Sequence, residues 1–271
     1  MPELPEVETT RTGIAAHIVG REVAGVVVRT PRLRLPISEE LITELPGKIV
    51  NAVERRAKYL LLRTVAGTVI LHLGMSGSLR LLTEPIPPGT HDHLDILFRD
   101  GPTLRFNDPR RFGLALWVRG NPFEHPSLCN LGPEPLEAEF DGDYLYHRSQ
   151  GRIVAVKAFL MDQHIVVGVG NIYASESLFL AGIHPAHPAG TISRARYVRL
   201  AKAVREVLTA AIAQGGTTLR DFHGSDGHPG YFQFALHVYG RDGAPCSRCS
   251  RPIRSERLGQ RNTFYCAHCQ R

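Results

Sequence analysis

The first residues of the chain, Met1-Pro2-Glu3-Leu4-Pro5-Glu6-Val7-Glu8, carry the most specific chemistry in the sequence. Removal of the initiator methionine would leave Pro2 as an N-terminal secondary amine, and an α-amino group titrates near pH ~8, so a useful fraction is neutral and nucleophilic. A secondary amine that condenses with a sugar carbon gives an iminium cation, an electron sink suited to elimination. Glu3 is placed to exchange protons with the reacting group. In the alternative interpretation Pro2 only permits methionine removal, and Pro5 begins a helix whose dipole favours the nearby acids.

Four of the five cysteines lie near the C-terminus, as Cys246-Ser-Arg-Cys249 and Cys266-Ala-His-Cys269. Two C-x2-C pairs at this separation predict a tetrahedral site for one structural Zn²⁺, because four thiolates leave no open coordination position. Such a small hairpin needs the metal for its folding energy. The residues between the pairs are basic and suit phosphate contacts, although a solvated basic loop has the same composition: Arg251, Arg254, Arg257 and Arg261. The fifth cysteine, Cys129, is expected to be a small core residue.

Two glycine-bounded loops each offer an apolar side chain: His72-Leu-Gly-Met-Ser-Gly77 contains Met75, and Asp108-Pro-Arg-Arg-Phe-Gly113 contains Phe112 beside Arg110. An apolar side chain with a neighbouring arginine can fill the space that a base leaves when it is extruded from duplex DNA. Met75 and Phe112 as ordinary core residues are an equally good interpretation of the sequence alone.

Three further motifs are less specific. Gly168-Val-Gly-Asn171 precedes a predicted helix, where Asn171 is a candidate cap and the backbone N–H groups are a candidate phosphate site, or a plain turn. Lys58 opens an apolar strand, which an ordinary surface lysine also does. His91-Asp92-His93 lacks a third metal ligand at a matching spacing, so a hydrogen-bonded His–Asp pair or a phosphate contact is the better interpretation.

Length and composition favour a folded two-domain protein. The chain has 271 residues, 43% of them hydrophobic, and its net charge of +6 is weak evidence for a polyanionic partner. No apolar run reaches membrane-spanning length, and the acidic start does not resemble a signal peptide. A cytosolic location is therefore expected.

The elements predicted for the first half are a helix over 6–18 that ends at Gly20, a short helix over 38–45 capped by Ser38, and a series of short strands. The strands are expected at 23–29, 59–64, 68–72, 78–82, 93–98, 103–106 and 114–118. Their number and spacing predict a sandwich or barrel.

A Pro- and Gly-rich stretch at 119–136 marks the domain boundary. Beyond it, helices are predicted over 144–163, 172–181 and 193–214, the last capped by Ser193 and stopped by Gly215-Gly216. A polar, Gly-rich loop follows over 217–235, a length typical of a functional lid or a disordered segment.

Together the motifs resemble the bacterial formamidopyrimidine-DNA glycosylase family over nearly the whole chain. The resemblance rests on the N-terminal motif, Arg56-Ala-Lys-Tyr59, the two glycine-bounded loops, Gly168–Tyr173 and the four-cysteine finger, in the family's order. It implies an α+β fold with an N-terminal β-sandwich and flanking helix (1–130), a helix–two-turn–helix domain with a lesion-capping loop (131–235) and a zinc-finger hairpin (236–271). The start Pro-Glu-Leu-Pro-Glu favours this branch over the endonuclease VIII branch, which typically starts Pro-Glu-Gly-Pro-Glu.

The resemblance also implies a base-excision-repair enzyme, a DNA glycosylase and AP lyase for 8-oxoguanine and formamidopyrimidines. Pro2 would form the Schiff base at the sugar C1′, Glu3 would transfer a proton, Lys58 would serve β-elimination and Arg261 δ-elimination. The residues expected to contact DNA are Met75, His91, Arg110, Phe112, Arg152, Lys157 and Asn171. The implied partner is double-stranded DNA containing oxidised bases, bound by a monomer in the bacterial cytoplasm at the nucleoid, with no membrane association.

Two positions depart from the family pattern. His228 stands in the capping loop where relatives often carry lysine, and Ala158 follows Lys157 where proline is common. Two other functions remain open: an endonuclease VIII-like glycosylase for oxidised pyrimidines, and a zinc-ribbon protein that binds DNA without catalysis. A pure binder would have no need for the set Pro2, Glu3, Lys58 and Arg261.

Overall fold

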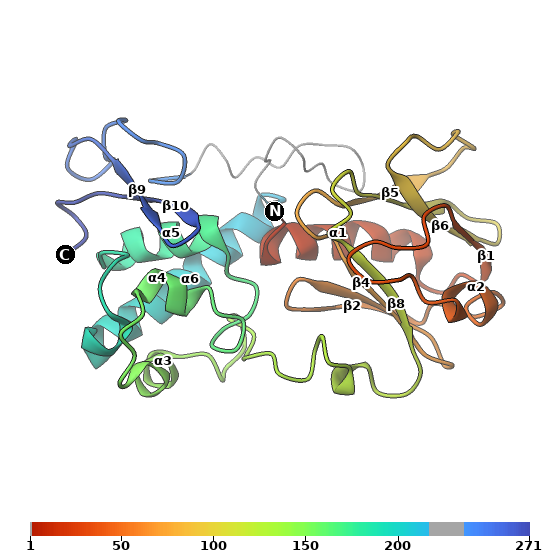
Figure 1. The fold of residues 1–271 in the computed structure, drawn as a ribbon, viewed down its shortest axis with the longest axis horizontal. Helices are drawn as coiled ribbons and strands as arrows, with labels where there is room; N and C mark the ends of the chain where they lie inside the picture. Colours follow the sequence, from red (N-terminus) through yellow and green to blue (C-terminus); the bar gives the residue numbers. More distant parts are fainter. Residues whose placement is uncertain (1, 217–235) are drawn as a thin grey trace. The chain divides into compact units, whose positions relative to one another are not determined.

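A computed structural model describes residues 2–216 and 236–271 (Figure 1). These residues form two compact units, one of residues 2–130 with 214–216 and the other of residues 131–213 with 236–271. The loop predicted over 217–235, including His228, lies outside the described residues.

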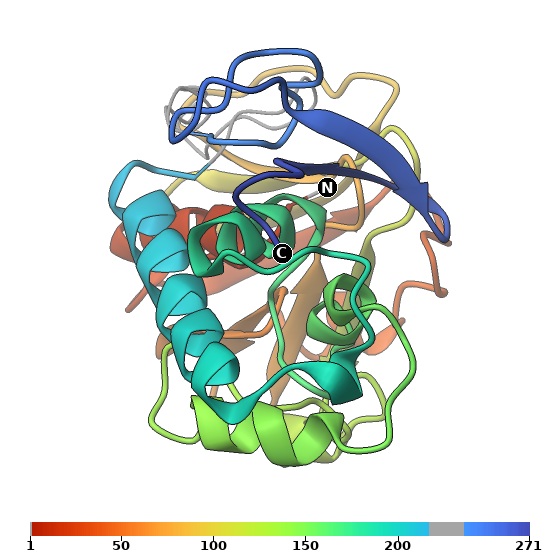
Figure 2. The same cartoon turned by 90° about the vertical axis from the view of Figure 1, so that its left-hand side faces the viewer.

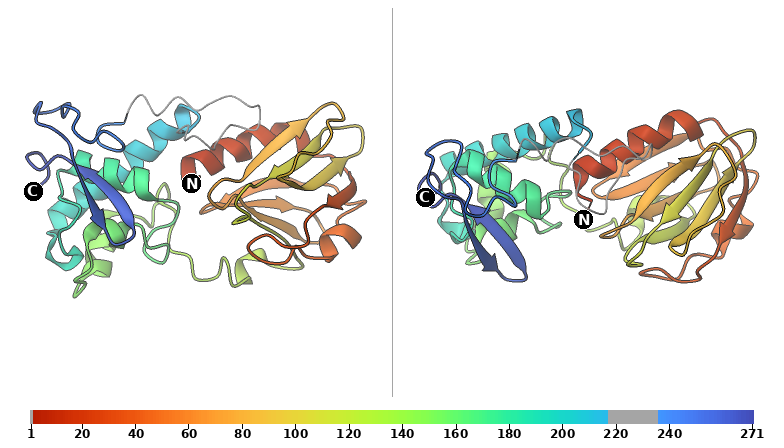
Figure 3. Two further views of the ribbon diagram at one scale, coloured as in Figure 1. Left: turned by 45° about the horizontal axis from the view of Figure 1, so that its top comes forward. Right: turned by 90° about the horizontal axis from the view of Figure 1, so that it is seen from above.

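The first unit is a β-sandwich with a helix, α1 (Leu4–Ile18), against it (Figure 3). One sheet has the strand order β1-β6-β7-β5 and the other β2-β3-β4-β8, and every neighbouring pair is antiparallel. The strands are β1 (Val23–Val28), β2 (Ala52–Arg56), β3 (Tyr59–Arg63), β4 (Thr68–His72), β5 (Ser78–Leu82), β6 (Asp92–Phe98), β7 (Thr103–Asn107) and β8 (Leu114–Val118). The predicted sandwich is confirmed.

Apolar side chains from both sheets and from α1 share one core. Val7, Ile14 and Ile18 of α1 are buried with Leu60 of β3 and Phe106 of β7. These residues are seven and four positions apart, which places them on one face of α1, and this is the pattern that predicts the helix. Its N-terminus is capped by Glu6, whose Oε2 accepts the backbone N–H of Glu3 at 2.8 Å.

Two local predictions in this unit need correction. Strand β2 is absent from the prediction, because Ala52-Val-Glu-Arg-Arg is a half-exposed edge strand with few apolar residues. The helix predicted over 38–45 is only one turn, α2 (Glu40–Thr43), and Ser38 does not cap it. Instead the Ser38 hydroxyl accepts the backbone N–H of Trp117 at 3.2 Å, since Ser38 lies beside β8.

The second unit is helical and ends in a two-stranded hairpin (Figure 2). Its elements are α3 (Gly142–Ser149), α4 (Val156–Leu160), α5 (Asn171–Ala181), α6 (Arg194–Ala213), β9 (Arg254–Leu258) and β10 (Arg261–Tyr265), with short 3-10 turns at Ala189–Thr191 here and Pro122–Glu124 in the first unit. The single helix predicted over 144–163 is wrong. The chain breaks between α3 and α4, where Gly151 takes a left-handed φ of 72° that a continuing helix cannot contain.

The long helix α6 agrees with its prediction and stops where Gly215 and Gly216 take φ of 75° and 80°. No helix among the described residues is long and apolar enough to span a membrane.

Candidate catalytic and DNA-binding site

The N-terminal motif is buried at the start of α1. Pro2 and Glu3 both lie in buried positions, with Glu3 only 2% exposed, and α1 begins at the next residue. The capping bond from Glu6 fixes the backbone of Glu3. A nucleophile at this position is therefore held on a rigid helix end and protected from bulk water.

Lys58 lies in the tight turn that joins β2 to β3, where Arg56 pairs directly with Tyr59. The turn puts Ala57 at φ 55°, a conformation that costs energy for a residue with a Cβ. Arg55 secures it: Nη1 donates to the Ala57 carbonyl at 3.1 Å, and Nε donates to Glu8 Oε2 of α1 at 2.8 Å. The Glu8–Arg55 ion pair thus ties the helix that follows Pro2 and Glu3 to the hairpin that carries Lys58.

The Glu8 carboxyl responds to this contact. Burial raises its pKa, but hydrogen bonds from Arg11 and Arg55 outweigh burial and hold the pKa below its usual value. Glu8 therefore stays ionised and paired with Arg55 at neutral pH.

The two glycine-bounded loops are joined by the carboxylate of Asp108, which is fully buried. Its Oδ1 accepts the Ser76 hydroxyl at 2.9 Å, and its Oδ2 accepts the Gly113 N–H at 2.7 Å. The loops also touch through backbone: a Cβ on Gly74 would lie 2.5 Å from the Phe112 carbonyl carbon, so only glycine fits there. Loops 73–77 and 108–113 consequently form one rigid surface.

The apolar residues of these loops point outward rather than into the core. Met75 is 37% exposed and Phe112 is 46% exposed, which removes the core interpretation left open by the sequence. The Arg110 guanidinium lies 4.8 Å from the centre of the Phe112 ring, a cation–π contact. Phe112 is thus an exposed aromatic ring with an arginine over it, and its role at DNA stays a prediction.

His72, at the start of loop 73–77, is held in its neutral form. Burial, together with the charges of Lys58 and Arg34, lowers its pKa from 6.5 to about 4. Its Nδ1 accepts the Gly74 N–H at 2.9 Å, and its ring contacts Tyr59 with 4.7 Å between centroids. The electrostatic effect of Lys58 and Arg34 on one imidazole indicates a positive region beside the loop.

His91 and His93 have different surroundings, and the hydrogen-bonded His–Asp pair considered above does not form. Asp92 binds Arg80 and Asn107, whereas the buried His93 ring contacts Thr30 Oγ1 at 2.9 Å and the Asp108 carbonyl at 2.8 Å. The side chain of His91 is exposed, and its carbonyl accepts the Asp108 N–H. His91 is therefore available to a ligand beside the 108–113 loop.

In the second unit, Lys157 and Asn171 converge on the finger hairpin. Lys157 is 2% exposed and donates to Thr263 Oγ1 at 2.8 Å, and Asn171 Nδ2 donates to the Asn262 carbonyl at 3.1 Å. Lys157 and Arg261 also line one cavity of about 440 Å³. A phosphate contact by Lys157 would have to share its ammonium with the bond to Thr263.

Two expectations for this unit concern nearby residues. Asn171 does not cap α5: the cap is Gly170, and Asn171 is the first helical residue. Arg152 is exposed, and its backbone is fixed by the Ser149 carbonyl and the Gly190 N–H, each at about 2.9 Å or less.

The four cysteines of the finger fit a zinc ion. Their sulfur atoms all lie within 4.8 Å of one another, with 3.9 Å between Cys246 and Cys269 and 3.5 Å between Cys249 and Cys266. A tetrahedral site with Zn–S bonds of ~2.3 Å requires sulfur atoms about 3.8 Å apart. The donor set therefore suits one structural Zn²⁺. Cys129, by contrast, is exposed rather than in the core, because it lies in the linker turn after Pro126.

Several supporting residues escaped the sequence interpretation. Arg55, Glu8, Asp108 and Thr263 each connect segments that are distant in sequence, and only the Asp108 position could have been noticed, as an acid opening a glycine-bounded loop. Partners across such distances leave no periodic signal.

The sandwich with its N-terminal helix, the helical unit and the thiolate hairpin define a two-unit α+β protein with a C-terminal zinc finger. The chain matches the models of the formamidopyrimidine-DNA glycosylase N-terminal domain over residues 1–115, its H2TH domain over 131–223 and the zinc finger found in FPG and IleRS over 243–271. Formamidopyrimidine-DNA glycosylases of Syntrophotalea carbinolica and Alkalilimnicola ehrlichii are 59% and 60% identical to it, each over 100% of both chains.

Solved structures agree. The crystal structure of MutM (Fpg) from Thermus thermophilus superposes with a TM-score of 0.90 at 38% identity, covering 99% of this chain and 98% of that one. A Lactococcus lactis Fpg mutant in complex with Fapy-dG containing DNA superposes with a TM-score of 0.93 at 34% identity, covering 99% of both. The chain belongs to the formamidopyrimidine-DNA glycosylase family, whose members are glycosylases with AP lyase activity.

Proposed function

We propose that this protein excises oxidised purines from duplex DNA through a Schiff base on Pro2 and then cuts the strand by β,δ-elimination. The observation that carries the proposal is the N-terminal arrangement in the first unit. Pro2 and a 2%-exposed Glu3 lie at the start of a capped helix that the Glu8–Arg55 pair ties to the Lys58 turn. The relatives at 59% and 60% identity support the same reaction.

The proposed chemistry follows from the residue types. The Pro2 nitrogen attacks C1′ of the damaged nucleotide as the C1′–N bond to the base breaks. The Pro2 nitrogen then loses its proton, and the sugar ring opens at the C1′–O4′ bond with Glu3 transferring a proton to O4′, which leaves an iminium between Pro2 and C1′. The resulting iminium acidifies the C2′ proton, so that its removal expels the 3′ phosphate, with Lys58 assisting. Arg261 assists the second elimination, which releases the 5′ phosphate.

DNA is the proposed partner, as in the Lactococcus lactis complexes with Fapy-dG and abasic-site DNA. Met75, Phe112 and Arg110 would fill the space left by the extruded base, and His91, Arg152, Lys157 and Asn171 would hold the backbone. We further propose that the protein acts as a monomer at the nucleoid.

Borohydride trapping tests the nucleophile. Reduction during turnover of an 8-oxoguanine duplex should freeze one covalent adduct that peptide mapping assigns to residue 2. A matched control carries an N-terminal extension that cannot be cleaved, so Met1 stays attached and the Pro2 nitrogen is an amide. This protein should still bind DNA but should form no adduct. An adduct on Lys58 alone, or trapping by the extended protein, would overturn the assignment.

A panel of duplexes separates the remaining functions. Release of 8-oxoguanine and formamidopyrimidines ahead of oxidised pyrimidines supports the proposal, whereas the reverse order supports an endonuclease VIII-like enzyme. Binding without any base release would indicate a non-catalytic DNA-binding protein.

A further inference from the structure

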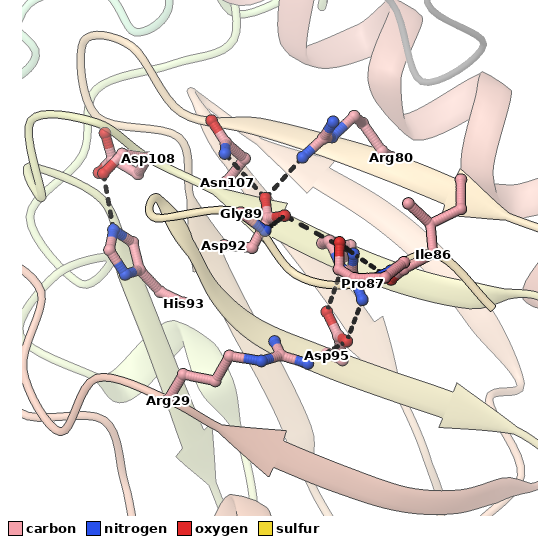
Figure 4. Close-up of polar contacts among 11 residues, drawn as sticks. Arg29, Arg80, Ile86, Pro87, Gly89, Asp92, His93, Asp95, Asn107 and Asp108 are labelled. Atoms are coloured by element: carbon pink, nitrogen blue, oxygen red, sulfur yellow. Dashed lines mark hydrogen bonds and ion pairs between the residues drawn. The ribbon is translucent and has the colours of Figure 1, made fainter.

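Three arginines and two aspartates form an ionic network on one face of the β1-β6-β7-β5 sheet (Figure 4). Arg105 of β7 binds Asp95 of β6 through two bonds of 2.8 Å, and its Nη1 lies 3.6 Å from Asp92. Arg29 completes the shell of Asp95 at 2.6 Å, and Arg80 that of Asp92 at 2.5 Å. Asp92, Asp95 and Arg105 are each 5% exposed or less.

A β-bulge in β6 makes this network possible. Side chains three residues apart in a regular strand point to opposite faces, yet Asp92 and Asp95 reach the same guanidinium. The register of β6 against β7 shifts between Asp92 and Leu94, which places the extra residue at His93. The bulge turns Asp92 onto the arginine face and leaves His93 directed to Asp108, a re-aiming of side chains typical of bulges near active sites.

The network holds the segment that leads to His91. Residues 83–91 are all exposed, so no buried apolar side chain anchors them. A groove of about 450 Å³, lined by Ile86, Pro87, His91 and Arg105 among others, lies beside the segment. The position of segment 83–91 therefore depends on polar contacts rather than on apolar packing.

Those contacts come from the network itself. Arg105 Nη1 donates to the carbonyls of Ile86 and Pro87 at 2.9 and 3.4 Å, and Asp92 Oδ2 accepts the Gly89 N–H at 2.8 Å. Burial raises the pKa of Asp92, but bonds from Asn107 and Gly89 and the charges of Arg80 and Arg105 outweigh it and lower the pKa. Asp92 thus remains an acceptor for Gly89 throughout the neutral range.

We propose that Asp92 is the positioning residue that sets the place of His91 through its bond to the Gly89 N–H, and that DNA binding by His91 depends on Asp92 rather than on Arg105. The inference rests on the proposed contact between His91 and a DNA phosphate. A histidine on an exposed, unanchored segment would lose binding energy in ordering that segment, and the network removes this cost in advance.

The experiment compares two isosteric variants in the same strand. Asp92→Asn must turn its amide NH2 toward either Gly89 N–H or the Arg80 and Asn107 donors. We expect the remaining side-chain oxygen of the Asp92→Asn variant to keep the two donors Arg80 and Asn107, so that the Gly89 N–H loses its acceptor. Asp95→Asn is the matched control, since Asp95 is similarly buried and shares Arg105, but among the described residues its carboxylate binds arginines alone and does not hold Gly89. Circular dichroism and zinc content establish that both variants are folded.

We expect Asp92→Asn to weaken binding of an abasic-site duplex about tenfold, as a lost hydrogen bond to a charged group does. His91→Ala should have the same effect, and the double variant should be no weaker than either one, because both changes remove one contact. Asp95→Asn should bind within about twofold of the unmodified protein. Cleavage under saturating enzyme should keep its rate in Asp92→Asn, and exchange of the Gly89 amide should accelerate only there.

Additive effects of Asp92→Asn and His91→Ala, or equal losses in Asp92→Asn and Asp95→Asn, would overturn the positioning role. If His91→Ala leaves DNA binding unchanged, then His91 does not contact DNA and the positioning role of Asp92 is refuted as well. The proposed enzymatic function is judged separately, by trapping at Pro2, which none of these variants alters.

Discussion

The buried carboxylate of Asp108 should determine how well the protein distinguishes a lesion from normal DNA. Asp108→Asn keeps the shape of the side chain but replaces one acceptor oxygen by a donor. If the oxygen stays on the Gly113 N–H, the NH2 faces the Ser76 hydroxyl and the Arg110 N–H, which is 3.3 Å from the present Asp108 oxygen. The Arg110 N–H keeps Ser76 Oγ as an acceptor at 3.3 Å, but the Ser76 hydroxyl loses the Asp108 oxygen to which it donates. The backbone bonds of Asp108 to His91 and His93 remain.

The size of the effect follows from these contacts. A buried donor that loses its acceptor costs about 1–3 kcal/mol, and the Ser76 hydroxyl and Asp108 are both buried, so solvent cannot compensate. Ser76→Ala removes the hydroxyl from the same carboxylate. Because the two residues touch, the double variant should be less destabilised than the sum of the single variants, by about 1 kcal/mol. Urea unfolding measures all three.

The functional consequence is a change in discrimination. Loops 73–77 and 108–113 carry Met75 and Phe112, and loosening their connection should reduce the ratio of affinities for lesion and undamaged duplex by about tenfold, since extrusion of a base costs a few kcal/mol. Binding of undamaged duplex should hold, because no positive charge is lost. The exposed Asp100→Asn serves as the control. Unchanged discrimination in a destabilised Asp108→Asn protein would refute the reasoning.

Three other predictions follow from the same structure. Cys249→Ser should abolish zinc binding and weaken DNA binding by on the order of a hundredfold, with the melting transition of the sandwich unchanged; retention of full activity without metal would contradict a supporting role for the finger. Phe112→Ala should destabilise the fold by less than the ~3–5 kcal/mol typical of a buried phenylalanine, because Phe112 is exposed, and it should reduce lesion discrimination. Its plot of log binding constant against log salt should keep its slope, whereas Arg152→Ala should weaken binding of both duplexes alike and flatten that slope by about one. A changed slope in Phe112→Ala would argue against the intercalating role. The pKa of His72 is lowered from 6.5 to about 4 in the folded protein, so between these pH values the folded state keeps His72 neutral while the unfolded chain binds a proton. The free energy of unfolding should therefore fall by up to about 3 kcal/mol as the pH drops from 6.5 to about 4. His72→Gln should flatten the plot of unfolding free energy against pH over that range.

Elements and motifs with a local signal could be predicted from the sequence. The spacing of Val7, Ile14 and Ile18 identifies α1, and the two C-x2-C pairs identify the zinc site, because periodicity and metal geometry are written in neighbouring residues. The break near Gly151 was not predicted because a single glycine within a helical pattern is often tolerated. Here α3 ends at Ser149, Gln150 leaves the helical conformation with ψ 130°, and Gly151 follows with a positive φ.

Burial and long-range pairing could not be predicted in the same way. Phe112 and Cys129 could each be a core residue by type, and their exposure depends on loops whose path is set by Asp108 in one case and by the Pro126 turn in the other. The tie from Glu8 to Arg55 joins residues 47 positions apart, and no spacing rule links them.

The carboxylates around the proposed site hold the segments that carry the functional side chains, a role that the motifs alone do not reveal. Glu8, Asp92 and Asp108 each lie within a motif but away from the residue expected to react or to contact DNA, and each uses its charge to hold a neighbouring segment of backbone or an arginine. Buried carboxylates are costly unless they are fully paired, so a fold that retains several of them gains little stability from each. What they provide is fixed geometry for the Lys58 turn, the His91 segment and loops 73–77 and 108–113, where Met75, His91 and Phe112 are exposed and have little packing of their own. We expect the accuracy needed to extrude and attack one nucleotide to depend on these three acids, although none of them is among the residues proposed to contact DNA.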